Sequence, residues 1–255
     1  MNKLPLISVV TVSYNAASTI EKTILSVIQQ TYPNIEYIII DGGSTDGTVD
    51  IIKKYADRIA YWVSEPDKGI YDAMNKGIDI ATGAWINFMN SGDSYYENNV
   101  LENIFKQEYN ADYLVGIAAT PLGFWKPVRE DFMLSDVYNG GAVNHQASFI
   151  RKELFKDKYD ISNRIIADEL FFLQKIVFEE RVYKVISLVV CNYDDQGISS
   201  MKESLDEIHI ERNRFMKGHL PERIWADYEE TYIHKILREI KYKIVNKFSN
   251  FIYNK

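Results

Sequence analysis

Four short polar segments follow expected strands and carry the side chains most able to do chemistry. They are Ser13-Tyr14-Asn15, residues 41–44, residues 65–69 and Asn90-Ser91-Gly92-Asp93. Each segment alone is typical of a turn, because Gly, Asn, Asp and Ser favour turns. In an open parallel sheet, ligands bind outside the carboxyl ends of the strands. Four such segments at one edge therefore predict a binding crevice rich in carboxylates.

The glycine patterns of the two commonest nucleotide-binding loops are missing from the sequence. No segment matches the P-loop or the G-x-G-x-x-G turn, which argues against a common nucleoside triphosphatase or an NAD enzyme. Carboxylates take the place of the Lys and Arg side chains that usually surround a phosphate. A carboxylate-lined phosphate site is reasonable when a divalent cation lies between the two negative charges. The pattern therefore favours a metal-assisted site.

Strands and helices that alternate along the first half must position these segments. The apolar, β-branched runs predict strands over 6–13, 35–40, 59–64 and 85–89. Between them, apolar residues recur with the spacing of amphipathic helices. The first helix begins at a predicted capping box, Ser18-Thr-Ile-Glu21. This order predicts an α/β fold with a mostly parallel, doubly wound sheet.

The second half is less regular and ends in a helical extension. Its patterns predict a helix near 98–106, a strand near 112–119, a helix near 167–179 and a strand near 182–191. From about residue 202 the pattern is helical to the end. The single cysteine, Cys191, falls in the last of these strands and is expected to be a buried thiol. One cysteine cannot form an internal disulfide, so a reducing, cytoplasmic compartment is expected.

Composition and charge exclude several classes of protein. The chain has 255 residues, of which 46% are hydrophobic and 25% charged, which is typical of a globular protein. The net charge of −7 argues against a general nucleic-acid binder, which would carry a basic surface. No stretch reaches the roughly 18 apolar residues that span a bilayer.

The last 25 residues, 231–255, differ in charge from the rest of the chain. They contain six basic residues and Glu239 alone, a net +5, which leaves −12 for residues 1–230. Their apolar residues form one helical stripe and the basic residues occupy other faces. Such a helix favours contact with an anionic membrane, although packing on the body or on a second subunit remains open. We expect a chain truncated after residue 230 to sediment less with anionic liposomes; equal sedimentation would exclude membrane contact.

The four segments also occur as ordered motifs of a known family. Ile7-Ser-Val-Val-Thr-Val-Ser-Tyr-Asn-Ala16 is followed by Asp41-Gly-Gly-Ser-Thr-Asp-Gly-Thr48, by Asp67-Lys-Gly-Ile-Tyr-Asp-Ala-Met-Asn-Lys-Gly77 and by Ala81-Thr-Gly-Ala-Trp-Ile-Asn-Phe-Met-Asn-Ser-Gly-Asp93. This series resembles the family 2 glycosyltransferases with the GT-A fold, over about residues 5–200. The resemblance implies a nucleotide-sugar donor, a divalent metal (Mn²⁺ or Mg²⁺) and inversion at the anomeric carbon.

The resemblance also implies a division of the chain. Residues 1–200 would form the GT-A catalytic domain, with a donor-binding half at 1–100 and an acceptor half at 101–200. Residues 201–255 would form the C-terminal helical extension with its basic tail. By position in the motifs, eight residues would bind the donor: Val12, Tyr14, Asp41, Asp67, Asp72, Asn75, Ser91 and Gly92. Asp72 and Asn75 share one helix face, and a solvated helix face is the alternative for both.

Two positions depart from the family pattern. The family's metal motif is Asp-x-Asp or a relative, whereas Asn90-Ser91-Gly92-Asp93 leaves Asp93 as the only charged metal ligand. Diphosphate oxygens and water would fill the other coordination positions of Mg²⁺ or Mn²⁺. Gly42 stands where many members carry a second Asp after the first. That second Asp can read the base, so the resemblance does not identify the base of the donor.

An inverting transfer needs a general base for the acceptor hydroxyl. The family places a carboxylate at the start of a helix in the second half, and the match is Asp168, with Glu169 in reserve. A helix N-terminus would keep Asp168 ionised, although an acidic residue is also common at a helix start for structural reasons alone. His145 and Gln146 also fit the family and would contact the acceptor, the diphosphate or the metal.

The sequence therefore predicts a metal-dependent, inverting glycosyltransferase that acts on a glycan or a lipid-linked saccharide. The resemblance implies a role in bacterial surface polysaccharide synthesis, in the cytoplasm and on the inner face of the membrane. A catalytically silent nucleotide- or sugar-binding partner remains open because the Asp-x-Asp motif is incomplete. A sugar nucleotidyltransferase fits less well, because the usual Gly-rich, basic triphosphate loop is missing after the first strand.

Overall fold

The computed structural model describes residues 4–127, 143–195, 197 and 204–226. The chain divides into two compact units, residues 1–208 and residues 209–255. The first unit contains all of the described strands. The basic tail at 231–255 lies outside the described residues, so the membrane contact expected of it stays a prediction.

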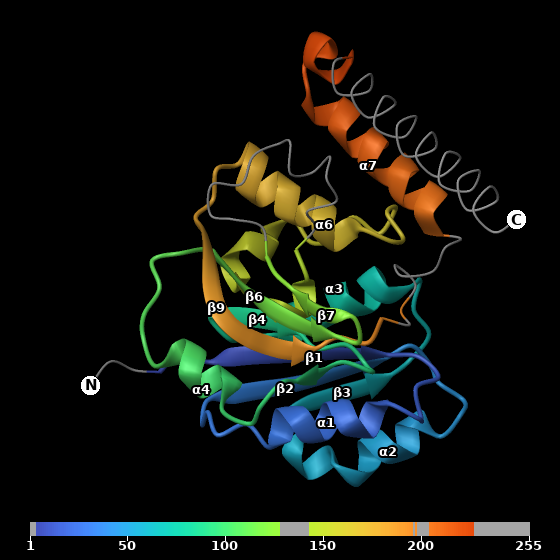
Figure 1. Cartoon of the computed structure of the whole chain (residues 1–255). Coiled ribbons are helices and arrows are strands. Elements are labelled where there is room, and N and C mark those ends of the chain that lie inside the picture. Colours follow the sequence, from blue (N-terminus) through green and yellow to red (C-terminus); the bar gives the residue numbers. More distant parts are fainter. Residues whose placement is uncertain (1–3, 128–142, 196, 198–203, 227–255) are drawn as a thin grey trace, which may run out of the picture. The chain divides into compact units, whose positions relative to one another are not determined.

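The described strands form a single sheet (Figure 1). Its order is β3-β2-β1-β4-β8-β6-β9-β5, and β7 pairs with β6. The strands run over β1 Ile7–Ser13, β2 Ile35–Asp41, β3 Tyr61–Ser64, β4 Trp85–Phe88, β5 Ser94–Tyr95, β6 Tyr113–Thr120, β7 Gly123–Trp125, β8 Ser148–Arg151 and β9 Tyr183–Asn192.

The first four strands form a parallel block. β1 pairs in parallel with both β2 and β4, and β2 pairs in parallel with β3. Ser13, Asp41 and Ser64 lie side by side at the carboxyl ends of β1, β2 and β3. The predicted polar segments therefore meet at one edge, because parallel strands end on the same side of a sheet.

Beyond β4 the sheet is mixed. β8 runs antiparallel to β4 and β6, β6 and β9 run parallel, and β5 runs antiparallel to β9. The α/β fold with helices on both faces is confirmed, while the parallel pairing of the first half does not extend through the second. The antiparallel strand β8 lets residues that precede it reach the carboxyl end of β4.

Helices cover both faces of the sheet (Figure 1). α1, α2 and α4 lie on one face, and their apolar residues join one buried cluster with β1 and β2. α3 lies on the other face. The helices run over α1 Ile20–Ile28, α2 Thr48–Lys54, α3 Ile70–Ile80, α4 Val100–Phe105, α6 Ala167–Phe172 and α7 Leu205–His219, and a π-helical turn, Leu173–Phe178, continues α6.

One local prediction at a helix start is wrong. The capping box at Ser18–Glu21 does not form, because α1 begins at Ile20 and its N-cap Thr19 makes no side-chain cap. Glu21 instead accepts hydrogen bonds from Lys54 and Tyr55, at 2.6 Å each. The tertiary contact with the end of α2 replaces the local one.

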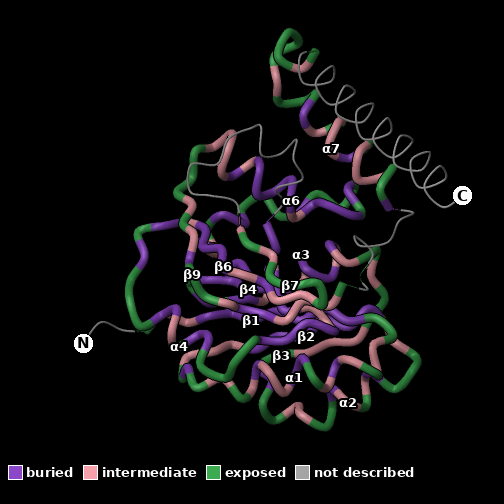
Figure 2. Tube along the Cα trace, viewed as in Figure 1, coloured by how far each residue is buried: buried purple, intermediate pink, exposed green. Residues whose placement is uncertain are grey.

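Within the parallel block, the core lies in β1, β4 and most of β2, whereas no residue of β3 is buried (Figure 2). All seven residues of β1 are buried, and so are all four of β4. Continuous apolar runs of this kind are typical of strands covered on both faces. Cys191 is buried at the end of β9, which confirms the prediction for that thiol. Among the described residues, no helix combines the length and the apolarity that a bilayer span requires.

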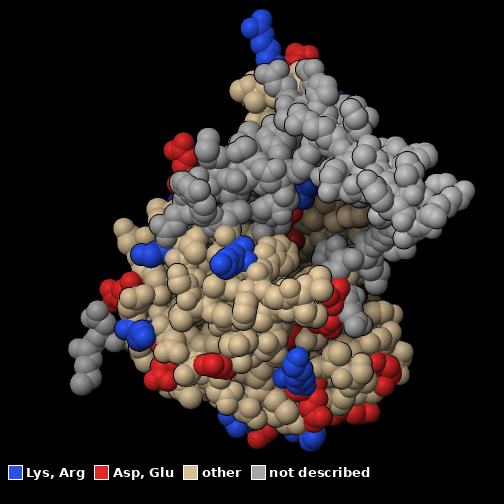
Figure 3. Space-filling model, in the orientation of Figure 1, with Lys and Arg blue, Asp and Glu red and all other residues tan. Residues whose placement is uncertain are grey.

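Charged side chains are interspersed on the face that Figure 3 shows. Lys and Arg alternate with Asp and Glu over this surface, and several approach each other closely. Lys54 pairs with Glu21 at 2.6 Å, and Lys76 with Glu65 at 2.8 Å. On this face, charge alone therefore marks no binding surface among the described residues.

Candidate active site

Asp41, at the carboxyl end of β2, organises the loop that follows it. Its side chain is fully buried and accepts hydrogen bonds from the hydroxyl groups of Ser13, Ser44 and Ser64, at 2.9, 2.6 and 2.6 Å. The amide groups of residues 43 and 44 donate two more. These hydrogen bonds hold the pKa of Asp41 below its usual value although burial opposes them. The carboxylate that was expected to hold the nucleoside is thus committed to the loop.

Gly42 explains the second departure from the family pattern. A Cβ atom at this position would lie 2.4 Å from Oδ2 of Asp67 and 3.4 Å from the ring of Tyr14. A side chain at position 42 is therefore excluded unless Asp67 moves. The side chain of Tyr14 is 68% exposed, so one ring face remains open for stacking. The three predicted donor positions Tyr14, Asp41 and Asp67 meet around this glycine.

Two predicted donor residues on α3 have hydrogen-bond partners within the protein. Asp72 accepts a hydrogen bond from the amide group of Lys68 at 3.0 Å and lies at the surface. Asn75 binds the backbone of Tyr159 in both directions, with its amide donating to the carbonyl and its carbonyl accepting from the N–H. The amide of Asn75 is thereby occupied, and in this structure it joins α3 to the second half of the chain.

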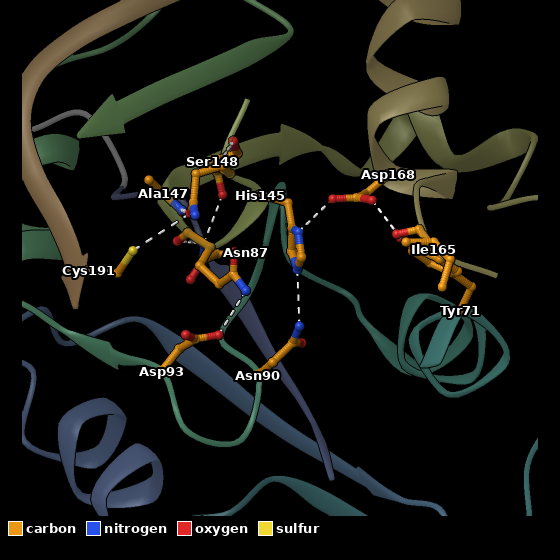
Figure 4. Close-up of polar contacts among 12 residues, drawn as sticks. Tyr71, Asn87, Asn90, Asp93, His145, Ala147, Ser148, Ile165, Asp168 and Cys191 are labelled. Carbon is orange, nitrogen blue, oxygen red and sulfur yellow. Dashed lines mark hydrogen bonds and ion pairs between the residues drawn. The ribbon is translucent and has the colours of Figure 1, made fainter. Parts of the chain in front are cut away.

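A short 3₁₀ turn, His145–Ala147, brings the two predicted acids of the site together (Figure 4). Nε2 of Gln146 donates to Oδ2 of Asp93 at 2.8 Å. Nδ1 of its neighbour His145 lies 2.6 Å from Oδ2 of Asp168. The cap of this turn is Asn144, whose side chain accepts the N–H of Ala147. Two consecutive residues thus hold the predicted metal ligand and the predicted base.

Asp168 lies on the first turn of α6 and faces a cavity. Its Oδ1 is 2.5 Å from the hydroxyl oxygen of Tyr71. The charge of His145, together with the hydrogen bonds from His145 and Tyr71, keeps the pKa of Asp168 below its usual value against the effect of burial. The same pairing raises the pKa of His145, against the desolvation that lowers it. Both shifts favour the ion pair, in which Asp168 is the carboxylate that a general base requires.

The pKa of Asp93 is raised, whereas that of Asp168 is lowered. Its side chain is 3% exposed, and burial raises its pKa to about 7. Its two oxygens accept from Gln146 and from the backbone N–H of Asp194, the latter at 2.8 Å. The nearby carboxylate of Asp194 raises the pKa of Asp93 further. A bound cation would reverse both effects, because it favours the charged form of a carboxylate.

A cavity lies beside Asp168, and Asp93 is linked to it through the lining residues Gln146 and Asp194. It encloses about 160 Å³ and is lined by residues of α3, the loop after β4, the 3₁₀ turn and the start of α6. Of the predicted residues, His145, Gln146, Asp168 and Glu169 line it directly. Val12, Ser91, Gly92 and Asp93 are not in its lining; Ser91 follows the lining residue Asn90, and its N–H donates to the carbonyl of Val12 at 3.1 Å. Tyr14, Asp41, Asp67, Asp72 and Asn75 are not part of its lining.

Several residues of the cavity were not found from the sequence. Tyr71, Asn90, Trp125, Arg164 and Asp194 all line it. Tyr71 and Asn90 fall inside quoted motifs, so their position could have singled them out. Trp125 and Asp194 follow less regular segments, and only the pairing of β9 with β5 and β6 brings Asp194 beside Asp93.

The loop after β4 fits a divalent cation that is shared with a ligand. Oδ1 of Asn90 and Oγ of Ser91 are buried and have no hydrogen-bond partner. A Cβ atom at Gly92 would lie 2.7 Å from Oδ2 of Asp194, so the glycine lets the carboxylate of Asp194 approach the loop beside Asp93. Among the described residues, no three His, Cys, Asp or Glu side chains form a cluster that could hold a metal ion alone. Diphosphate oxygens and water would have to complete the coordination.

A comparison with protein families decides the identity of the chain. The family model described as "Glycosyl transferase family 2" matches residues 8–176. This chain belongs to glycosyl transferase family 2. The match contains all of the predicted site residues from Val12 to Glu169. The expectation of a glycosyltransferase with the GT-A fold is thereby confirmed.

Two curated relatives support the assignment of this glycosyltransferase. An uncharacterized glycosyltransferase of Mycobacterium tuberculosis is 34% identical over 219 residues, which cover 80% of each chain. A "PGL/p-HBAD biosynthesis glycosyltransferase" of Mycobacterium bovis is 30% identical over 203 residues, which cover 76% of this chain and 78% of the relative.

Solved structures share the fold. S. aureus TarS 1–349, solved with UDP-GlcNAc, matches with a TM-score of 0.65 and 19% identity over 86% of this chain and 69% of TarS. The mannosyltransferase PcManGT of Pyrobaculum calidifontis, solved with GDP-Man and Mn²⁺, matches with a TM-score of 0.60 and 19% identity over 86% of this chain and 64% of its own. At this level of identity the match concerns the fold alone.

Proposed function

We propose that this glycosyltransferase moves a sugar from a nucleotide-diphosphate sugar to a hydroxyl group of a glycan or of a lipid-linked saccharide, with inversion at the anomeric carbon. The observation that carries the proposal is the 3₁₀ turn at His145–Ala147. His145 of this turn pairs with the low-pKa carboxylate of Asp168, which lines the cavity. Its neighbour Gln146, which also lines the cavity, donates to the buried carboxylate of Asp93 behind it. An inverting transfer needs these two functions on opposite sides of the reacting carbon.

In this mechanism the acceptor hydroxyl attacks the anomeric carbon while Asp168 takes its proton. The bond from the anomeric carbon to the diphosphate oxygen breaks, and its electron pair leaves on the nucleoside diphosphate. Asp93 and Asp194 would hold a divalent metal, Mn²⁺ or Mg²⁺, which when bound neutralises the negative charge of the diphosphate. Asn90 and Ser91 contribute neutral oxygens that have no other partner. Glu169, which is buried in the cavity wall, is the reserve base.

Donor binding is assigned to the edge formed by β1, β2 and β3. The open ring face of Tyr14 would stack on the base, with Val12 beside it, while Asp67 stands where a second Asp would otherwise read the base. Asp41 and Asn75 would act on the donor through the segments that they hold, because both polar atoms of each side chain already have protein partners. Asp72 would act in the same way through Oδ2, which accepts from the N–H of Lys68. This changes their predicted role from direct contact to positioning.

We infer the acceptor class from the names of the relatives. The names of the M. bovis protein and of TarS's ligand point to cell-envelope glycans and to a UDP-sugar donor, while PcManGT was solved with GDP-Man. These names support a role in surface polysaccharide synthesis, and they leave the base of the donor to experiment. A location at the inner face of the membrane stays a prediction.

A thermal-shift screen with UDP- and GDP-sugars, with and without Mn²⁺, tests donor binding. We expect one class to raise the Tm in the presence of Mn²⁺, because a ligand that binds only the native state stabilises it by mass action. In the matched control Asp93→Asn, the Mn²⁺-dependent part of the shift should disappear. Released nucleoside diphosphate would then identify transfer, whereas pyrophosphate would identify a nucleotidyltransferase. Binding without donor turnover would identify a silent binding partner.

A further inference from the structure

The hydroxyl group of Tyr71 lies between two acceptors at the edge of the cavity (Figure 4). Its oxygen is 2.5 Å from Oδ1 of Asp168 and 2.8 Å from the carbonyl oxygen of Ile165. A phenol has one hydrogen to donate, but its oxygen can also accept a hydrogen bond. While Asp168 is a carboxylate, that hydrogen serves only one of the two contacts. When Asp168 carries a proton, both contacts can be complete hydrogen bonds.

We propose that Tyr71 is a positioning residue that holds Asp168 in both protonation states of the transfer, a role that rests on the proposed function of Asp168 as the base. Before transfer, Tyr71 donates its hydrogen to the carboxylate. The proton of the acceptor hydroxyl then reaches Asp168 as the new glycosidic bond forms, and the electron pair of the broken bond leaves with the diphosphate. The carboxyl O–H now donates to Tyr71, whose own hydrogen turns to the carbonyl of Ile165.

The surroundings of Tyr71 fix the geometry that this exchange requires. Its side chain is 5% exposed, and its ring packs against Tyr159 at 5.5 Å between centroids. It stands on the first turn of α3, directly after the Asp67–Gly69 loop of the donor half. Asp168 belongs to the acceptor half, so one hydroxyl joins the two halves at the base. Two O–H groups have to turn, the new carboxyl O–H toward Tyr71 and the hydroxyl of Tyr71 toward the carbonyl of Ile165, and no heavy atom has to move.

Titratable groups from four elements face Asp168, and their roles differ. Tyr71 comes from α3, His145 from the 3₁₀ turn, Tyr113 from β6 and Tyr159 from the segment before α6. Burial raises the pKa of each of the three phenols, so they stay neutral. His145 and Tyr71 alone contact the carboxyl group, and both lower its pKa. The neutral hydroxyl of Tyr71 can also accept a hydrogen bond from Asp168 once Asp168 is protonated. His145 cannot do so, because in the ion pair its Nδ1, which faces Asp168, already carries a proton.

The variant Tyr71→Phe tests the proposal because it removes the hydroxyl and keeps the ring. We expect kcat to fall on the order of 10- to 100-fold, the range of one hydrogen bond to a charged group. The KM values for donor and acceptor should stay within about 2-fold. Removing a contact that lowers the pKa of Asp168 should also move the acid limb of the pH profile of kcat/KM to higher pH. A normal kcat with an unshifted profile would overturn the proposal.

Tyr32→Phe is the matched control. Tyr32 is a buried tyrosine whose hydroxyl donates to the carbonyl of Pro5 at 2.6 Å, away from the cavity. Its loss should leave the pH profile unchanged. If Tyr71→Phe folds poorly, 3-fluorotyrosine at position 71 is the second variant. This phenol is a stronger donor and a weaker acceptor, so the acid limb should move to lower pH; no movement would contradict the proposal.

The experiment separates this inference from the proposed function. Near-normal transfer by Asp168→Asn would refute the base and the role of Tyr71 together. An inactive Asp168→Asn combined with a normal Tyr71→Phe would refute the role of Tyr71 alone. If Tyr71→Phe lowers the residual rate of Asp168→Asn by the same factor as that of the wild type, Tyr71 acts independently of Asp168, and the inference is also wrong.

Discussion

Asp168→Asn should abolish glycosyl transfer and preserve donor binding. The amide keeps the shape of the carboxylate but cannot accept the proton of the acceptor hydroxyl, and general base catalysis contributes roughly 10²- to 10⁴-fold to a rate. We therefore expect kcat to fall by about that factor. The donor-dependent thermal shift should remain, because Tyr14 and Asp67 lie outside the lining of the cavity at Asp168 and the substitution leaves Asp93 unchanged. Turnover by purified enzyme, measured as released nucleoside diphosphate, tests the prediction.

Glu169→Gln is the control for the assignment of the base. Glu169 is the neighbour of Asp168 on α6 and also lines the cavity, but Asp168 is the residue that pairs with His145. Glu169→Gln should keep most of the activity if Asp168 is the base. If Glu169→Gln is inactive and Asp168→Asn turns over normally, the two roles are exchanged.

Asp41→Asn should be among the most destabilising isosteric substitutions in the donor half. The buried carboxylate accepts from three hydroxyl groups and two backbone amides, and an asparagine NH₂ group would face donors instead of accepting from them. A hydrogen bond to a charged group contributes about 1.5–3 kcal/mol, and losses within one network are not additive. We expect the free energy of unfolding to fall by about 3 kcal/mol, as measured by urea denaturation.

The pH dependence of this loss has a definite sign. The pKa of Asp41 is lower in the folded than in the unfolded protein, so the carboxylate stabilises the fold at pH values above its unfolded pKa. That contribution is lost as the pH falls through the folded pKa. The difference between wild type and Asp41→Asn should therefore be full at neutral pH and shrink in acid. Asp46→Asn, in the same loop but exposed, should cost less; an equal cost would contradict the importance of burial.

Asp41→Asn and Asp168→Asn test two different parts of the candidate active site. Asp41 holds the loop that forms the donor edge, whereas Asp168 acts at the cavity between α3 and α6. Tyr71 and Asn75, both on α3, connect the edge and the cavity through hydrogen bonds to Asp168 and to the backbone of Tyr159. The donor half therefore supplies partners for the acceptor half at the base itself.

Asp168 and Asp41 show how far the sequence could go. Both were found from the residues and the family motifs, because each stands at a position that a repeated pattern marks: the start of a helix and the end of a strand. Their pairings could not be found in this way, since even His145, a predicted site residue, was not predicted as the partner of Asp168. His145 and Tyr71 lie far from Asp168 in the chain, and the saturation of Asp41 depends on serines from three different strand ends. Hydrogen bonds between distant segments leave no periodic signal.

The sequence by itself determined the order of strands and helices, because apolar periodicity is a local property. The alternation of strands and helices then predicted the parallel block of the N-terminal half. The polar residues that follow each of its strands predicted the edge where the site lies. Only the tertiary structure decided which polar groups are free and which are occupied. It assigned Asp41 and Asn75 to the loops that they hold, brought Asp194 beside Asp93, and placed Tyr71 against Asp168. Burial removes water as a partner, so each polar atom must find its partner wherever the fold brings one.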